Sequence, residues 1–356
     1  MKRNSGLEVY RILAMVLIVA NHFSTQGALR GDILGAPLYN AYFAKVLACG
    51  GKLGVDMFVL ISSYFLSAST VRPSSLLITW LKTVFYGSLI FLVLTVLNLP
   101  VEGKFADAVL PVLRYNYWFV SCYLVLAILS PFLAVMLRGL GERRHRWLLV
   151  FLLVFFSVCP TFLHLRDHVL MCFHTPMTWF VVLFVLGAYL RYYVRVERIP
   201  RRKVICVLSF MTLSVLAWVL ICELVARFGH HTWKWQKIRD MNSIFMVTIS
   251  TCALVFFAQM RTWRNQWVNR IAACTFGVYL LHSNRSLNLI IWDRMLGVKS
   301  TVGCGWFVPF ALASSLAVYV GCTFLEFVRQ LRMRPLENWV RTRLAGIDEK
   351  VCIFFK

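Results

Sequence analysis

One long apolar stretch near the start of the chain decides the fold: Leu7-Glu8-Val9-Tyr10-Arg11-Ile12-Leu13-Ala14-Met15-Val16-Leu17-Ile18-Val19-Ala20-Asn21-His22-Phe23. It is long enough for a membrane-spanning helix, yet it contains both Arg11 and His22. Eleven residues bring a helix back to within about 20° of its starting face, roughly 16 Å further along. Because ionisable groups inside a bilayer usually face a cavity or a partner, we expect this stripe to belong to a functional site.

The composition of the whole chain is that of a polytopic membrane protein. Hydrophobic residues make up 60% of the 356 positions, charged residues make up 15%, and the mean hydropathy is +0.70. Windows of about 20 residues predict an all-α transmembrane helical bundle of about ten spans. The predicted spans are 7–26, 53–69, 76–97, 117–137, 147–163, 176–194, 204–225, 243–260, 271–291 and 306–328.

The second span is the shortest of the ten. It follows the glycine-rich run Gly50-Gly51-Lys52-Leu53-Gly54, where we expect the chain to re-enter the membrane from a loop. The moderately apolar stretch 39–49 is expected to lie along the interface. Residues 1–340 are predicted to form the transmembrane domain, and residues 341–356 a short basic cytoplasmic tail.

The net charge of +23 invites a nucleic-acid reading, but the placement of the 38 basic residues argues against it. With ten spans and both termini in the cytoplasm, the larger share of the lysines and arginines falls on cytoplasmic segments. That imbalance is what the positive-inside rule expects, so we interpret the charge as topology signals and contact with anionic lipid. The alternative is that a cytoplasmic anionic ligand binds some of these arginines. We therefore predict no nucleic-acid partner.

The same topology sorts the histidines. His22 ends the first span on the outer side, His282 lies in the outer half of span nine, and His145 is cytoplasmic. Five others fall in or beside outer loops: His164, His168, His174, His230 and His231. Of these, His164, His168, His230 and His231 are interpreted as ordinary loop residues. No fixed ligand spacing or metalloprotease motif is present, so no metal site is predicted.

A neutral imidazole beside a reactive hydroxyl can act as a general base, and this is our reading of His22; a polar residue emerging at the interface is the alternative. Asp56 reaches a similar depth and would balance His22 or Arg285. On the predicted span nine, Tyr279, His282 and Arg285 follow one another at i, i+3 and i+6.

The remaining candidates have structural alternatives. Tyr117 and Trp118 begin span four from the outer side, where an aromatic belt is equally expected. Arg285 is a snorkelling candidate at the outer headgroups. Arg11 is a natural phosphate ligand, but it would also pair with Glu8 one helical turn away, or with Glu326 in span ten.

Four motifs in order make the chain resemble a known family. They are Arg11-x10-His22; Gly54-Val55-Asp56-Met57-Phe58-Val59-Leu60-Ile61-Ser62-Ser63-Tyr64-Phe65-Leu66; Tyr117-Trp118-Phe119-Val120 with Ser130-Pro131-Phe132; and Thr275-Phe276-Gly277-Val278-Tyr279-Leu280-Leu281-His282. This pattern resembles the membrane acyltransferase 3 family, integral-membrane O-acyltransferases of bacterial surface glycans. The resemblance extends from about Ser5 to about Trp339. One departure is Ser63, where the family often has glycine.

The resemblance implies a reaction and a location. Such an enzyme takes an acyl group, here expected to be acetyl, from cytosolic acyl-CoA as co-substrate and delivers it to a sugar hydroxyl of an extracytoplasmic polysaccharide or glycolipid. No permanently bound cofactor is implied. The expected location is the bacterial plasma (inner) membrane, as a multi-pass protein among its lipids. We expect a stand-alone transferase without the extracytoplasmic esterase-like domain that some members append.

The site residues take roles accordingly. Arg11 would bind the phosphates of acyl-CoA, and His22 would be the general base or would itself be acylated. The further catalytic candidates are Asp56, Tyr279 and His282. The substrate-binding candidates are Tyr117, Trp118 and Arg285, with Arg285 or Tyr279 also placed to stabilise an oxyanion.

Two other classes of function compete with the enzyme. A proton-coupled transporter or flippase for a glycan-related solute would equally need buried arginine, histidine and aspartate, although no internal repeat is evident. A non-catalytic membrane scaffold or sensor is the third class, and the intact Arg11 and His22 disfavour it.

Overall fold

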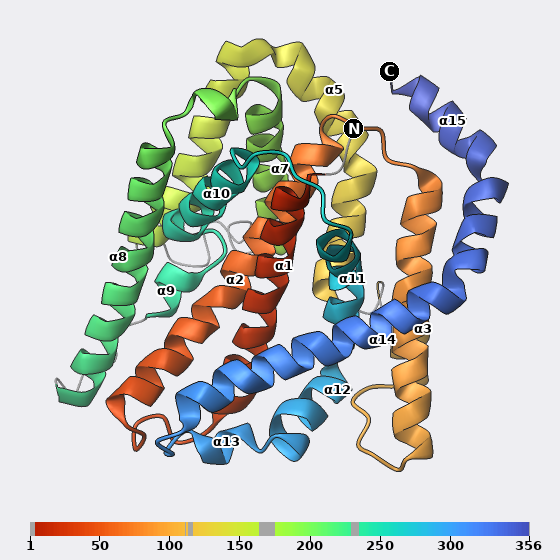
Figure 1. The fold of residues 1–356 in the computed structure, drawn as a ribbon. Coiled ribbons are helices and arrows are strands. Elements are labelled where there is room, and N and C mark those ends of the chain that lie inside the picture. The colour runs from red at the N-terminus through yellow and green to blue at the C-terminus, as the bar shows by residue number, and fades with distance from the viewer. Residues whose placement is uncertain (1–3, 111, 113–116, 164–174, 229–234, 356) are drawn as a thin grey trace.

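The computed structural model describes residues 4–110, 112, 117–163, 175–228 and 235–355, and every regular element in these residues is a helix (Figure 1). The predicted all-α class is therefore confirmed. Within the described ranges, the longer helices of the bundle are α1 Ser5–His22, α2 Leu38–Leu66, α3 Pro73–Val96, α5 Trp118–Leu153, α7 Pro176–Tyr192, α8 Arg201–Phe228, α10 Ile244–Ala258, α11 Gln266–His282 and α14 Phe307–Arg343.

Shorter elements connect them. The short α-helices are α4 Phe105–Val109, α6 Cys159–Phe162, α9 Gln236–Arg239, α12 Arg285–Leu289, α13 Val298–Thr301 and α15 Ala345–Phe354. Of the short elements in the described residues, three are π-helical, namely η1 Phe23–Gly27, η3 Val154–Val158 and η6 Ile290–Met295. Two others in the same residues are 3₁₀-helical, η2 Ala28–Arg30 and η5 Val196–Arg198.

Among the described residues, seven helical stretches are long and apolar enough to cross a membrane. One of them, Trp118–Phe162, contains two of the ten predicted spans. These two halves meet at Gly141, whose φ of 71° breaks the helical backbone where α5 turns over at the top of Figure 1. Two further predicted spans correspond to α7 and α11, each of 17 residues.

The second predicted span was drawn wrongly. Residues 39–49 do not form a separate interfacial segment, because α2 runs unbroken from Leu38 to Leu66. Gly50 and Gly54 do not form a turn but lie where α2 contacts α1. A methyl group added at Gly50 would lie 3.0 Å from the Leu17 carbonyl oxygen, and one at Gly54 would lie 2.5 Å from that of Ala14. Small residues therefore let α2 approach α1 closely.

The ninth predicted span is also too long. Helix α11 ends at His282, and Asn284 starts α12 by accepting hydrogen bonds from the backbone N–H groups of Ser286 and Leu287, both at 3.2 Å. Asparagine at an N-cap favours a new helix over continuation of the old one. Arg285 consequently does not lie on the helix that carries Tyr279 and His282.

Helix α1 lies at the centre of the bundle and packs against α2, α10, α11 and α14 (Figure 1). Its buried face joins a core that includes Tyr10, Phe23, Trp179 and Phe307. Peripheral helices instead expose large apolar side chains, for example Phe210 on α8, as expected of surfaces that face lipid.

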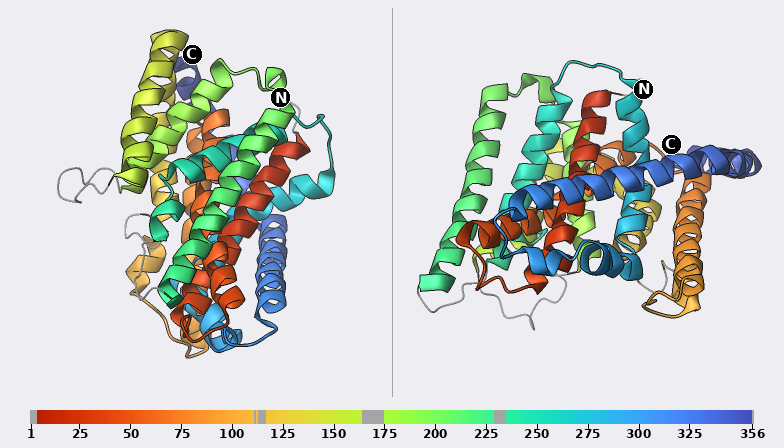
Figure 2. Two further views of the ribbon diagram at one scale, coloured as in Figure 1. Left: turned by 90° about the vertical axis from the view of Figure 1, so that its left-hand side faces the viewer. Right: turned by 60° about the horizontal axis from the view of Figure 1, so that its bottom comes forward.

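The long helix α14 crosses the bundle obliquely, and α15 continues from its far end beside α3 (Figure 1 and Figure 2). There the Asp348 carboxylate accepts hydrogen bonds from the backbone N–H of Ser74, at 3.0 Å, and from its hydroxyl, at 2.5 Å. Residues 341–354 thus continue α14 and form α15.

Candidate active site

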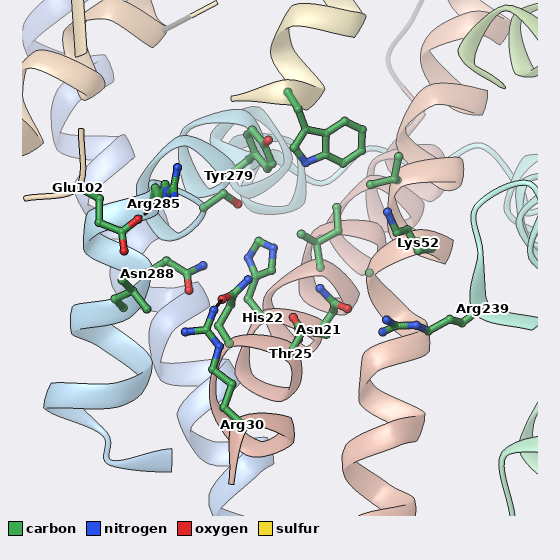
Figure 3. Close-up of a pocket in the computed structure, with 17 residues that line it drawn as sticks. Asn21, His22, Thr25, Arg30, Lys52, Glu102, Arg239, Tyr279, Arg285 and Asn288 are labelled. Carbon is green, nitrogen blue, oxygen red and sulfur yellow. Dashed lines mark hydrogen bonds and ion pairs between the residues drawn. The ribbon is translucent and has the colours of Figure 1, made fainter. Parts of the chain in front are cut away.

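A pocket of about 520 Å³ opens where the C-terminal end of α1 meets α2, α11 and α12 (Figure 3). The start of α5 and the short helix α9 close further sides of it through Trp118 and Arg239. Its volume lies within the range of small-molecule binding sites. Four of the residues singled out from the sequence line this one pocket, namely His22, Trp118, Tyr279 and Arg285.

His22 is the last residue of α1, and its imidazole stands in the middle of the pocket (Figure 3). Its Nδ1 is buried, and the ring makes no hydrogen bond to any residue that the structure describes. The chain continues directly into the π-helical turn η1, which brings Thr25 and Gln26 into the same wall. Such turns are frequent at functional sites.

His282 lies beside His22, with 5.0 Å between the ring centroids. Its Nδ1 is 2.5 Å from the carbonyl oxygen of Val278, one turn earlier on α11, so in the neutral ring Nδ1 carries the proton and donates it. The lone pair is then on Nε2, 3.3 Å from the hydroxyl of Ser283, which can donate to it. His282 is completely buried, whereas Ser283 lines the pocket.

Two aromatic residues, Trp118 and Tyr279, line the pocket. The ring of Trp118 lies under the ammonium group of Lys52, 5.4 Å from its centroid. Tyr279 packs edge-on against His282, at 6.3 Å between centroids. An indole face with a cation beside it is a surface on which a sugar ring can stack.

Arg285 and Tyr117 were both predicted to bind substrate, but only Arg285 lines the pocket. Arg285 forms an ion pair with Glu102, and its side chain is 77% exposed at the edge of the pocket. Tyr117 is buried behind the wall, where its hydroxyl donates to the Leu280 carbonyl oxygen and accepts from the Asn284 amide, both at 2.9 Å. Tyr117 thus ties the start of α5 to the end of α11.

Asp56 does not line the pocket. It is fully buried on α2, and its Oδ1 accepts a hydrogen bond of 2.9 Å from the indole N–H of Trp179 on α7, while its Oδ2 has no hydrogen-bond partner among the described residues. Trp179, not His22 or Arg285, is therefore the hydrogen-bond partner of this carboxyl group.

Arg11 lies on the same helix as His22 but outside the pocket. Its guanidinium pairs with the Glu8 carboxylate at 2.8 Å, one of the two pairings expected from the sequence. Glu326 has other partners: Tyr86 at 2.5 Å and Arg329 at 2.7 Å. With its side chain 23% exposed, Arg11 remains within reach of a ligand.

Sequence reasoning missed several side chains of the pocket. Lys52 lies four residues before Asp56 on α2. The predicted second span began at residue 53, so Lys52 was assigned to the loop before it. Arg239 comes from a segment that reads as a loop, so no periodicity indicates it. Asn288 follows the break after α11 and donates a hydrogen bond of 3.1 Å to the His282 carbonyl oxygen.

The outer-loop histidines His164, His168, His174, His230 and His231 lie outside the described residues. Among the residues that are described, no three histidine, cysteine or acidic side chains come together as metal ligands would.

Comparison with known proteins gives one match. The acyltransferase 3 family model, described as an acyltransferase domain, matches residues 4–326. The matched region contains all the residues of the pocket and Arg11. No curated protein and no solved structure matches the chain.

Proposed function

The chain belongs to the acyltransferase 3 family, and on that premise we propose that it transfers an acetyl group from acyl-CoA to a hydroxyl of an extracytoplasmic glycan. One observation carries this proposal. His22, buried at Nδ1 and without a hydrogen-bond partner among the described residues, stands in a polar pocket large enough for a sugar ring. A base that is not engaged by the protein is available to a substrate.

The proposed reaction begins with His22 accepting the proton of the sugar hydroxyl. The hydroxyl oxygen attacks the thioester carbon, an ester C–O bond forms, and the C–S bond breaks. The CoA thiolate leaves and takes up the proton from the imidazolium, so that His22 returns to its neutral form. In the alternative sequence of steps, His22 attacks the thioester first and carries the acyl group to the hydroxyl.

Neighbouring side chains have supporting roles in this proposal. His282, whose proton is held on Nδ1 by the Val278 carbonyl, positions the ring of His22 through their contact. We favour Tyr279 over Arg285 for stabilising the oxyanion, because Arg285 is already paired with Glu102. Trp118 provides the face for the sugar.

The orientation in the membrane is part of the proposal. Several apolar helices and the family membership support a multi-pass membrane protein. With the N-terminus in the cytoplasm, Arg11 lies toward the cytosolic supply of acyl-CoA and His22 toward the outer side. The two residues are eleven positions apart on α1, roughly 16 Å along the helix axis. An extended pantetheine arm can cover that distance.

The test is acyl transfer by purified protein supplied with labelled acetyl-CoA and membrane glycan from the source cells. We expect His22→Ala to lower transfer by about 10²–10⁴-fold, the usual contribution of a general base. His145→Ala is the matched control, because His145 is also buried but packs between tyrosines of α7, away from the pocket. Half of the original turnover in His22→Ala would remove this residue from the mechanism.

A further inference from the structure

The pocket around His22 has a marked excess of positive charge. Four cationic side chains line it, Arg30, Lys52, Arg239 and Arg285, against the single carboxylate of Glu102. A pocket built for an uncharged sugar needs hydroxyl and amide groups but no such excess, since bringing cations together costs energy unless an anion joins them.

Two of these cations are already engaged by protein groups. Arg285 is paired with Glu102, and Arg30 donates a hydrogen bond to the Gln26 side chain. Both lie away from Lys52 in Figure 3, with the Arg285–Glu102 pair on the opposite side of His22.

Lys52 and Arg239 are the other two cationic side chains that line the pocket. They come from α2 and α9 and lie on the same side of His22 (Figure 3). Neither is within ion-pair distance of an acidic side chain in the part of the chain that the structure describes, although Asp240, next to Arg239 in the sequence, is near enough to Lys52 to interact with it electrostatically. Each instead rests on an indole ring, Lys52 at 5.4 Å from the centroid of Trp118 and Arg239 at 4.7 Å from that of Trp235. Both are partly buried, so their charges are less screened than those of surface residues.

We propose that the acceptor carries an anionic group, a carboxylate or a phosphate, which Lys52 and Arg239 bind while the acceptor hydroxyl meets His22. This inference rests on the proposed acyl transfer and adds the chemical class of its acceptor. An anion at this side of the pocket would receive charge-assisted hydrogen bonds from an ammonium and a guanidinium. Trp118, which lies under Lys52, would contact the sugar ring that bears the anion.

The phosphates of acyl-CoA have the same chemistry and are the other source of an anion. The two sources differ in what the cations should affect. If the two cations bind the acceptor, removing Lys52 and Arg239 should weaken the binding of an anionic sugar and leave the affinity for CoA unchanged. If they bind the phosphates of acyl-CoA, removing them should weaken CoA binding and leave sugar binding unchanged.

The experiment measures binding to the purified protein at constant ionic strength, with methyl glucuronide and methyl glucoside as matched probes that differ only at C6, a carboxylate in the first and a hydroxymethyl group in the second. We expect the glucuronide to bind at least about tenfold more tightly, as one charge-assisted contact allows. In the double variant Lys52→Met/Arg239→Gln the two probes should bind alike. The control Arg294→Gln/Lys299→Met also loses one arginine and one lysine, but outside the pocket, and should keep the preference.

The second part of the experiment measures the binding of desulfo-CoA, which has the phosphates of CoA but cannot carry an acyl group. We expect its affinity to be unchanged in Lys52→Met/Arg239→Gln. Equal binding of the two sugars to the original protein, or a tenfold loss of desulfo-CoA affinity in the double variant, would overturn the anionic acceptor. Neither result concerns His22: the loss of acyl transfer in His22→Ala tests the proposed function separately.

Discussion

Arg11 has one observed partner and one proposed ligand, and substitutions on the two sides of its ion pair separate them. If Arg11 binds the phosphates of acyl-CoA, Arg11→Ala should raise the KM for acyl-CoA by about tenfold or more, because a charge-assisted contact is lost. Glu8→Gln removes the ion pair seen at 2.8 Å but keeps the guanidinium, so it should leave that KM nearly unchanged. Steady-state kinetics of both variants, with melting temperatures of the same preparations, provide the comparison.

Equal effects of the two substitutions on stability, with no change in the KM for acyl-CoA, would give Arg11 a structural role only. Arg11→Lys adds a graded measurement, because lysine keeps the charge but lacks the planar fork that binds phosphate through two hydrogen bonds.

The residues of the site differ in how far the sequence could indicate them. His22 and Tyr279 stand out because an ionisable or polar group in an apolar helix is costly unless it has a purpose. Lys52 and Arg239 do not stand out, since a basic residue near a glycine-rich run or in a polar segment is common. Their approach to His22 depends on the packing of α9 and α2 around α1, which no local pattern encodes.

The helical class and the approximate position of most helices were predictable from the sequence, but the ten-span count is not matched by the seven described stretches that could cross a membrane, and the ends of several helices were misplaced. Hydropathy measures how apolar a window is, so it located the stretches that became α1, α3 and α8. It is insensitive to the difference between a glycine in a turn and a glycine in a helix contact, and therefore divided α2. It also missed the asparagine cap that ends the ninth span early.

Helix packing at Gly54 gives a prediction at this scale. Gly54→Ala would bring a methyl group to 2.5 Å from the Ala14 carbonyl oxygen and 2.7 Å from Ile18 Cγ1, so we expect a loss of about 1–3 kcal/mol in stability. Gly321→Ala on α14 is the control, since a methyl group there meets nothing within 4 Å and alanine favours the helix. Thermal unfolding in one detergent compares them; an equal or higher melting temperature for Gly54→Ala would contradict the close contact of α1 with α2.

At the scale of the whole molecule, the distribution of positive charge predicts which side of the membrane each loop faces. Leu34, 66% exposed between η2 and α2, should be outside, whereas the exposed Glu142 next to the α5 bend should be cytoplasmic. In a cysteine-depleted background, a membrane-impermeant thiol reagent should label Leu34→Cys on intact cells and label Glu142→Cys only after permeabilisation. The opposite pattern would invert the bundle and put His22 on the cytoplasmic side.

The unbroken length of α2 has a consequence for how the protein sits in its lipid. Its 29 residues extend about 43 Å, while the hydrocarbon layer is about 30 Å thick. If Leu66 lies at the inner boundary, Lys52 is about 21 Å along the helix and the first turns of α2 stand clear of the hydrocarbon. In the proposed orientation, the pocket then lies below the level of the outer headgroups. The proposed glycan acceptor would have to enter from the water to that depth, which the lipid chain length would set as much as the protein does.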